Sequence, residues 1–156
     1  MTRPRPTAST EDKSQREVNA GMVARFREMD PQPYVDGSHV LRVVTIPGRV
    51  SGEPRPVPIA ITKLGDRRYL CSPSRSRDWA ANLAAAGRCT VEGDDPADYT
   101  ATQVDGDEAV TALHTYLGNV VRLRGAGGPN MWPFPKDAPA EEIRDHLDQV
   151  AVFRLV

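Results

Sequence analysis

One segment of the chain combines glycine, serine and arginine at a spacing that could bind an anion. It is the run PGRVSGEPRP, residues 47–56. Its two glycines let the backbone approach a ligand, and Ser51 offers a hydroxyl group. Arg49 and Arg55 have planar guanidinium groups that suit a phosphate or a carboxylate. A long hairpin turn with exposed arginines accounts for the same residues equally well.

A second segment with similar chemistry leads into a predicted helix. The run SPSRSR, residues 72–77, precedes the alanine-rich residues 78–86, for which Ser76 or Asp78 is the expected N-cap. The free N–H groups and positive dipole end of a helix attract anions, and two arginines strengthen that attraction. An ordinary capped helix with solvated basic neighbours is the alternative. Two such segments after neighbouring strands favour one shared phosphate-bearing ligand.

Several other catalytic patterns are missing from the sequence. It contains no GxSxG nucleophile motif, no P-loop and no GxGxxG after a strand. Its three histidines are far apart, which argues against a dedicated metal site. Cys71 and Cys89 lie in apolar stretches without a CxxC partner and are expected to be buried, inert thiols. If the protein is an enzyme, a bound cofactor is expected to carry the reaction.

Charge is distributed unevenly along the 156 residues, although the net charge is only −1. Residues 42–88 hold nine basic and three acidic side chains, whereas residues 94–108 hold six acids and no base. This pattern favours a small anionic ligand over nucleic acid, which needs a broader basic face; ordinary solvated charge is the alternative. No apolar stretch approaches the ~18–20 residues of a membrane span, and no signal sequence is visible, so we expect a cytoplasmic protein.

The elements that must position these segments are mainly β-strands. Runs rich in β-branched or alternating apolar residues predict six strands, at residues 39–46, around 57–61, and at 68–72, 88–92, 99–104 and 150–156. Gly65-Asp66 predicts a tight hairpin between the second and third. Few helices interrupt these strands, which predicts a mainly β (α+β) fold: a small barrel of mostly antiparallel strands with flanking helices.

Helical patterns flank the strands. Residues 1–14 are expected to be disordered and to precede an amphipathic helix with an apolar stripe of Val18, Met22, Phe26 and Met29, so that residues 1–30 form a tail and helix, and residues 31–156 a single barrel domain. Further helices are expected at 78–86, around 110–120 and around 143–150. A Gly/Pro-rich loop at 124–139 has the length and aromatic content of a functional or mobile loop.

The stretch from about Val43 to Gly93, a third of the chain, resembles the deazaflavin-dependent nitroreductase family, whose pattern includes G-R-K-S-G-x-P-R and W-x-x-N-L. The matching residues are Gly48, Arg49, Ser51, Gly52, Pro54, Arg55 and Pro58 in the first block, and Trp79, Asn82, Leu83 and Ala85 in the second. The resemblance implies a split β-barrel that binds the deazaflavin coenzyme F420, with FMN as the alternative cofactor. It also implies that the phosphate and oligoglutamate tail of F420 would lie in the basic groove, with the deazaflavin ring nearer the barrel.

The resemblance also implies a set of cofactor-binding residues. Arg49, Ser51 and Arg55 would hold the phosphate-side tail, residues Ser74, Arg75, Ser76 and Arg77 would meet the phosphate, and Trp79 with Asn82 would shape the ring pocket; Gly52 and Pro58 belong to the same matched block. Val50 replaces the family's lysine, and Arg75-Ser76-Arg77 replaces its usual Lys-Gly-Gly. The catalytic group stays unassigned. Tyr116 and residues 130–132 are candidates for the substrate side, and a packing role accounts for Tyr116 at least as well.

The implied activity is hydride transfer from reduced F420 to a small organic acceptor, such as a nitro compound, a quinone or an activated alkene. Two alternatives stay open: an FMN-dependent enzyme on a related barrel, and a non-catalytic protein that sequesters F420. The expected partner is a small-molecule substrate, and a second copy of the chain, forming a homodimer, is a further candidate. Neither nucleic acid nor a membrane is expected as a partner.

Overall fold

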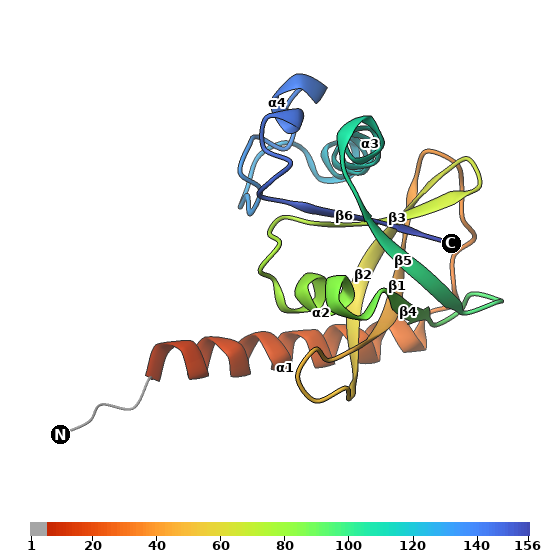
Figure 1. Ribbon diagram of the computed structural model, residues 1–156, viewed down its shortest axis with the longest axis vertical. Helices are drawn as coiled ribbons and strands as arrows, with labels where there is room; N and C mark the ends of the chain where they lie inside the picture. Colours follow the sequence, from red (N-terminus) through yellow and green to blue (C-terminus); the bar gives the residue numbers. More distant parts are fainter. Residues whose placement is uncertain (1–5) are drawn as a thin grey trace.

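Six antiparallel strands close into a barrel in the computed structural model, which describes residues 6–156 and the side chains from residue 15 onward (Figure 1). Neighbouring strands follow the order β1-β2-β3-β6-β5-β4, and β4 pairs with β1 to complete the circle. The strands are β1 (His39–Pro47), β2 (Pro54–Leu64), β3 (Arg67–Ser72), β4 (Arg88–Val91), β5 (Asp98–Val104) and β6 (Ala151–Leu155). The mainly antiparallel barrel expected from the sequence is confirmed.

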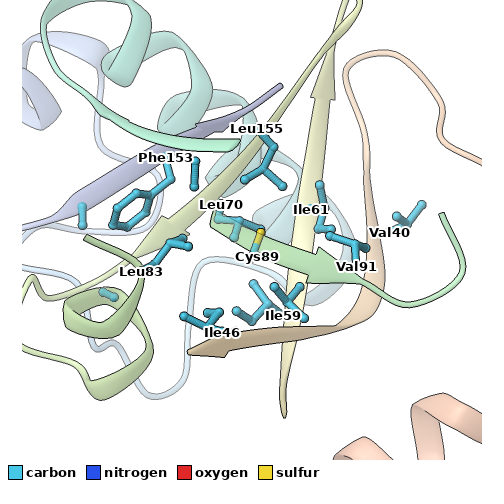
Figure 2. Packing of buried hydrophobic residues seen from close by; sticks show 14 residues of the cluster. Val40, Ile46, Ile59, Ile61, Leu70, Leu83, Cys89, Val91, Phe153 and Leu155 are labelled. Atoms are coloured by element: carbon cyan, nitrogen blue, oxygen red, sulfur yellow. The ribbon is translucent and has the colours of Figure 1, made fainter. Parts of the chain in front are cut away.

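The barrel closes because each strand turns one apolar side inward. Val44, Ile61, Leu70 and Phe153 are fully or almost fully buried and meet inside, with other inward side chains shown in Figure 2. The strand pattern of alternating side chains places these residues on one face of the sheet. The β2–β3 hairpin turns at Gly65, whose φ of +62° lies in the left-handed region that glycine adopts without strain.

Three helices are attached to the barrel in different ways. Helix α2 (Asp78–Ala86) buries Leu83 in the interior cluster and so lies against one end of the barrel (Figure 2). Helices α3 (Gly106–Arg124) and α4 (Ala140–Arg144) form a second apolar cluster on the outside of β3 and β6. Phe134, from the loop expected at 124–139, is buried in this outer cluster, so part of that loop packs as core.

Helix α4 is shorter than the helix expected at residues 143–150. After Arg144 the backbone forms turns, in which the N–H of His146 donates to the carbonyl of Ile143 at 3.0 Å and that of Gln149 to His146 at 3.0 Å. The guanidinium of Arg75 also donates a hydrogen bond to the carbonyl oxygen of Val150, at 2.7 Å. These contacts direct the chain into β6 and end the helical hydrogen bonding early.

Helix α1 (Pro6–Glu28), red in Figure 1, runs along the side of the barrel that holds α2. The structure assigns residues 6–14 to this helix, where we expected a disordered segment, while residues 1–5 lie outside the described part. Proline is tolerated in a first helical turn, and the residue types of Glu11 and Lys13 favour helix. The side facing the barrel centres on Val23, which is 5% exposed. Of the expected stripe, Val18, Met22 and Met29 are exposed, and only Phe26 is half-buried, in a hollow beside β1.

Folding brings much of the uneven charge together. Arg42 and Asp94, with side chains 5% and 3% exposed, form an ion pair at 3.2 Å, and the hydroxyl of Tyr34 donates to Asp94 at 2.8 Å. Arg67 and Glu108 form a second ion pair, at 3.4 Å, whose side chains are more exposed. The basic and acidic segments therefore partly neutralise each other.

Candidate functional site

The loop between β1 and β2 is folded by its glycines and by Ser51. The N–H of Gly48 donates to the carbonyl of Glu53 at 2.8 Å, and the hydroxyl of Ser51 accepts from the N–H of Glu53 at 3.2 Å. Gly52 has a φ of +75°, which disfavours any larger residue. A Cβ on Gly48 would lie 3.3 Å from Ser51 Oγ and 3.4 Å from Arg55 Nε. Glycine at position 48 therefore allows Ser51 and Arg55 to approach the same point.

Asn82 connects this loop to helix α2. Its Oδ1 accepts the backbone N–H of Arg49 at 3.0 Å and the Nη1 of the same arginine at 2.7 Å. Arg49 Nη2 also lies 3.4 Å from Asp78 Oδ1. Asn82 is only 7% exposed, so its side chain is a buried acceptor shared by the backbone and side chain of one residue. The two sequence blocks that resemble the same family thus meet directly.

A groove of about 660 Å³ lies where the loop, α2 and α1 come together. Its floor includes Ile46 and Val57 from the barrel, and the half-buried indole of Trp79 forms part of its wall. Four arginines and one aspartate line it: Arg16 and Arg27 from α1, Arg49 from the loop, Arg55 from the start of β2, and Asp78 from α2. The groove is therefore basic, with an aromatic side chain at its edge.

Residues 72–77 behave differently from the expectation. Helix α2 has Arg77 as its N-cap residue without a side-chain capping bond, so neither Ser76 nor Asp78 caps it. The hydroxyl of Ser76 is instead 2.8 Å from that of Ser74, which draws it away from the helix end. Arg75 donates to the carbonyls of Leu147 and Val150, at 2.9 and 2.7 Å, and so braces the turn before β6.

The expected site residues consequently fall into separate places. Arg49, Ser51, Arg55, Trp79 and Asn82 line the groove, whereas Ser74, Arg75 and Ser76 line a shallower hollow with Trp132 and Met131. Arg77 reaches the sulfur of Met131 at 3.1 Å. Gly52 shapes the loop, and Pro58 lies within β2, paired with Val43.

Tyr116 lies in the outer apolar cluster on α3, on the other side of the barrel from α1 (Figure 1). Its ring is 5.4 Å from that of His39 and 6.2 Å from that of Trp132. Burial raises the pKa of Tyr116 above its usual value, and burial also lowers the pKa of His39. Tyr116 is therefore a weaker acid than a free tyrosine and is placed among packing partners.

Sequence reasoning missed the residues that α1 contributes. Arg16, Asn19 and Arg27 line the groove, with Ala20, Val23 and Ala24 between them. Their spacing of three and four residues marks one helical face, and this signal was present in the sequence. It was obscured by the more apolar stripe on another face of the same helix.

Among the described residues, no three His, Cys, Asp or Glu side chains are grouped as a metal would require. Within the same part of the chain, every helix is too short or too polar to cross a membrane. Cys71 and Cys89 are both free thiols.

The chain is similar to several solved structures, although no family model and no curated protein matches its sequence. A domain-swapped dimer is 19% identical, with a TM-score of 0.50, and the similarity covers 97% of this chain and 99% of that one. This similarity establishes the architecture. The chain has the split β-barrel fold. It is the fold that the resemblance to the deazaflavin-dependent nitroreductase family predicts.

Two further solved structures share part of this similarity. An F420-H2 dependent reductase, FDR-A, is 19% identical with a TM-score of 0.47, covering 80% of this chain and 99% of that protein. A heme-binding protein from Mycobacterium smegmatis is 20% identical with a TM-score of 0.47, covering 74% of this chain. The chain spans 45% of the length of that heme-binding protein.

Proposed function

We propose that the protein is an F420H2-dependent oxidoreductase of the deazaflavin-dependent nitroreductase family, acting on a small organic acceptor such as a nitro compound, a quinone or an activated alkene. The observation that carries the proposal is the contact of Arg49 with Asn82. This contact, between residues 33 positions apart, joins the GRVSGEPR and WAANL blocks at one basic groove. The contact of the two blocks at one groove supports a single binding site.

The groove suits a ligand with an anionic tail and an aromatic ring. Arg55 is exposed and makes no ion pair with any residue from 15 to 156, so its guanidinium can bind a phosphate or carboxylate. Ser51 lies beside it across Gly48. Arg49 is already engaged by Asp78 and Asn82, and its part is to hold the loop against α2. Trp79 offers an apolar face for a ring.

When bound, reduced F420 would supply a hydride from its ring to the acceptor, and a proton would complete the reduction. The protein's own residues then have three tasks: Arg55 and Ser51 bind the tail, Trp79 and Asn82 form the wall beside the ring, and the barrel end excludes water. Ser74 and Ser76 bond to each other through their hydroxyls in the separate hollow, so we assign them no contact with the ligand in the groove. We assign no proton transfer to Tyr116, because it packs in the outer cluster.

The test is a titration of the purified protein with F420 and, in parallel, with FMN, following Trp fluorescence. Saturable binding of F420 in preference to FMN supports the proposal, and turnover with reduced F420 and a set of acceptors then tests catalysis. Preference for FMN would overturn the cofactor assignment. Binding of F420 without turnover of any acceptor would favour a sequestering protein over an enzyme.

A further inference from the structure

Helix α1 turns an unexpected face to the barrel. The residues that line the groove from α1 include two arginines, an asparagine and two alanines: Arg16, Asn19, Ala20, Ala24 and Arg27. The long apolar residues Val18, Met22 and Met29 point to solvent, with exposures of 53%, 40% and 44%. A surface helix normally buries its apolar stripe against the core. In α1, by contrast, the residues that line the groove are polar or small, apart from the buried Val23.

The helix is held at both the centre and the C-terminal part of this face. Val23 is its buried anchor. Near its end, Arg27 forms a two-bond ion pair with Glu92, with Nε–Oε1 and Nη2–Oε2 distances of 3.0 and 2.8 Å. The alanines before and after Val23 have no side chain beyond Cβ and leave the groove open between helix and loop. Arg27 is therefore held by Glu92 and positions α1. Arg16 lies about two helical turns before the anchor Val23, toward the N-terminus of the helix.

The opposite wall has few cations that are not already engaged. Arg49 is bound by Asp78 and Asn82, and position 50 holds an exposed valine in place of a cation. On this wall of the groove, Arg55 is then the cation that remains to bind an anion. A flexible tail that bears several carboxylates needs more than one cation, since each charge-assisted contact is local.

We infer that α1 is the second wall of the cofactor site and that Arg16 binds the carboxylates of the oligoglutamate tail across the groove from Arg55. This inference rests on the proposed function and adds to it a residue, an element and a part of the ligand. The loop binds the tail near the phosphate, and α1 binds it farther along.

The experiment compares Arg16→Ala with Arg25→Ala, using two probes. Arg25 is an exposed arginine on the same helix that does not line the groove, so both variants lose the same charge. The probes are F420 with its glutamate tail and the tail-less form, which keeps the ring and phosphate. We expect Arg16→Ala to weaken binding of tailed F420 about tenfold, as for one charge-assisted hydrogen bond, and to leave the tail-less form within about twofold. Arg25→Ala should change neither affinity by more than about twofold.

Each other outcome decides the matter. Equal affinities of Arg16→Ala and Arg25→Ala for tailed F420 would overturn the role of Arg16 while wild-type binding still supports the proposed function. Equal weakening toward both probes would overturn the assignment to the tail. If the wild-type protein binds neither probe, the proposed function itself fails, and this inference with it. An Arg16→Lys variant should recover part of the affinity, and unchanged thermal unfolding of all variants shows that the fold is intact.

Discussion

The site geometry makes its most specific prediction for the effect of Asn82→Ala on stability and on F420 binding. The side chain of Asn82 is buried and accepts two hydrogen bonds from Arg49, at 3.0 Å from the backbone N–H and 2.7 Å from the guanidinium. Removing it leaves a backbone N–H without its partner, which costs about 1–3 kcal/mol. The guanidinium bond adds less, because the Arg49 side chain is 42% exposed and water can replace the lost acceptor.

We therefore expect Asn82→Ala to lower the free energy of unfolding by about 2 kcal/mol. For a chain of this size, that corresponds to a decrease in Tm of roughly 4–8 °C. The loop would also lose its attachment to α2, so the affinity for F420 should fall as well. Differential scanning calorimetry and a fluorescence titration below the transition measure the two effects separately.

Two controls separate stability from binding. Asn119→Ala removes another buried asparagine, whose Nδ2 donates to Gly37 O at 2.8 Å, and it lies on α3 away from the groove. It should lower Tm without changing the affinity for F420. Asn82→Asp keeps an acceptor for Arg49 but adds a negative charge to the groove, so it should preserve Tm better than Asn82→Ala and still weaken F420 binding. An unchanged Tm in Asn82→Ala would refute the proposed link between the two blocks.

Three other substitutions test separate parts of the structure. Arg55→Ala should weaken F420 binding by about 1.5 kcal/mol, the lower end for a charge-assisted bond because the side chain is exposed; an unchanged Kd in titration would remove it from the site. Asp94→Ala leaves the buried Arg42 without its counter-ion and should cost about 3 kcal/mol or more in denaturant unfolding, with F420 affinity retained in the folded protein. Burial raises the pKa of the Cys89 thiol to about 12, so the folded state keeps a proton that the unfolded state loses above about pH 8.5, and stability falls as pH rises from there. Tm should therefore decrease less steeply between pH 8.5 and 11 in Cys89→Ala than in the wild type, and parallel slopes would contradict this.

The strands could be predicted well from the sequence because their signals are local. The β-branched run at residues 39–46 became β1 (His39–Pro47), and Gly65-Asp66 is the hairpin turn expected from its dipeptide. Helix α2 begins and ends at the expected residues. Its end could be predicted because Gly87 adopts the left-handed conformation that terminates a helix. Each of these features depends on a few neighbouring residues.

The orientation of α1 and the fate of the arginines could not be predicted in the same way. A helical stripe identifies an apolar face, but which face packs depends on Glu92 and the barrel surface, both far away in sequence. Likewise, Arg75 looked like a ligand for phosphate, yet it donates to carbonyls more than 70 residues later in the chain. A count of charges shows that cations are present, and only their partners in the fold decide which remain for a ligand.

Calorimetric or fluorescence titration of the wild-type protein with F420 and FMN tests the central claim most directly. We expect saturable binding of F420, weaker or absent binding of FMN, and weaker F420 binding in Arg55→Ala. Tight binding of FMN with no response to F420, or an F420 affinity that is unaffected by Arg55→Ala, would contradict the assignment of the basic groove to F420.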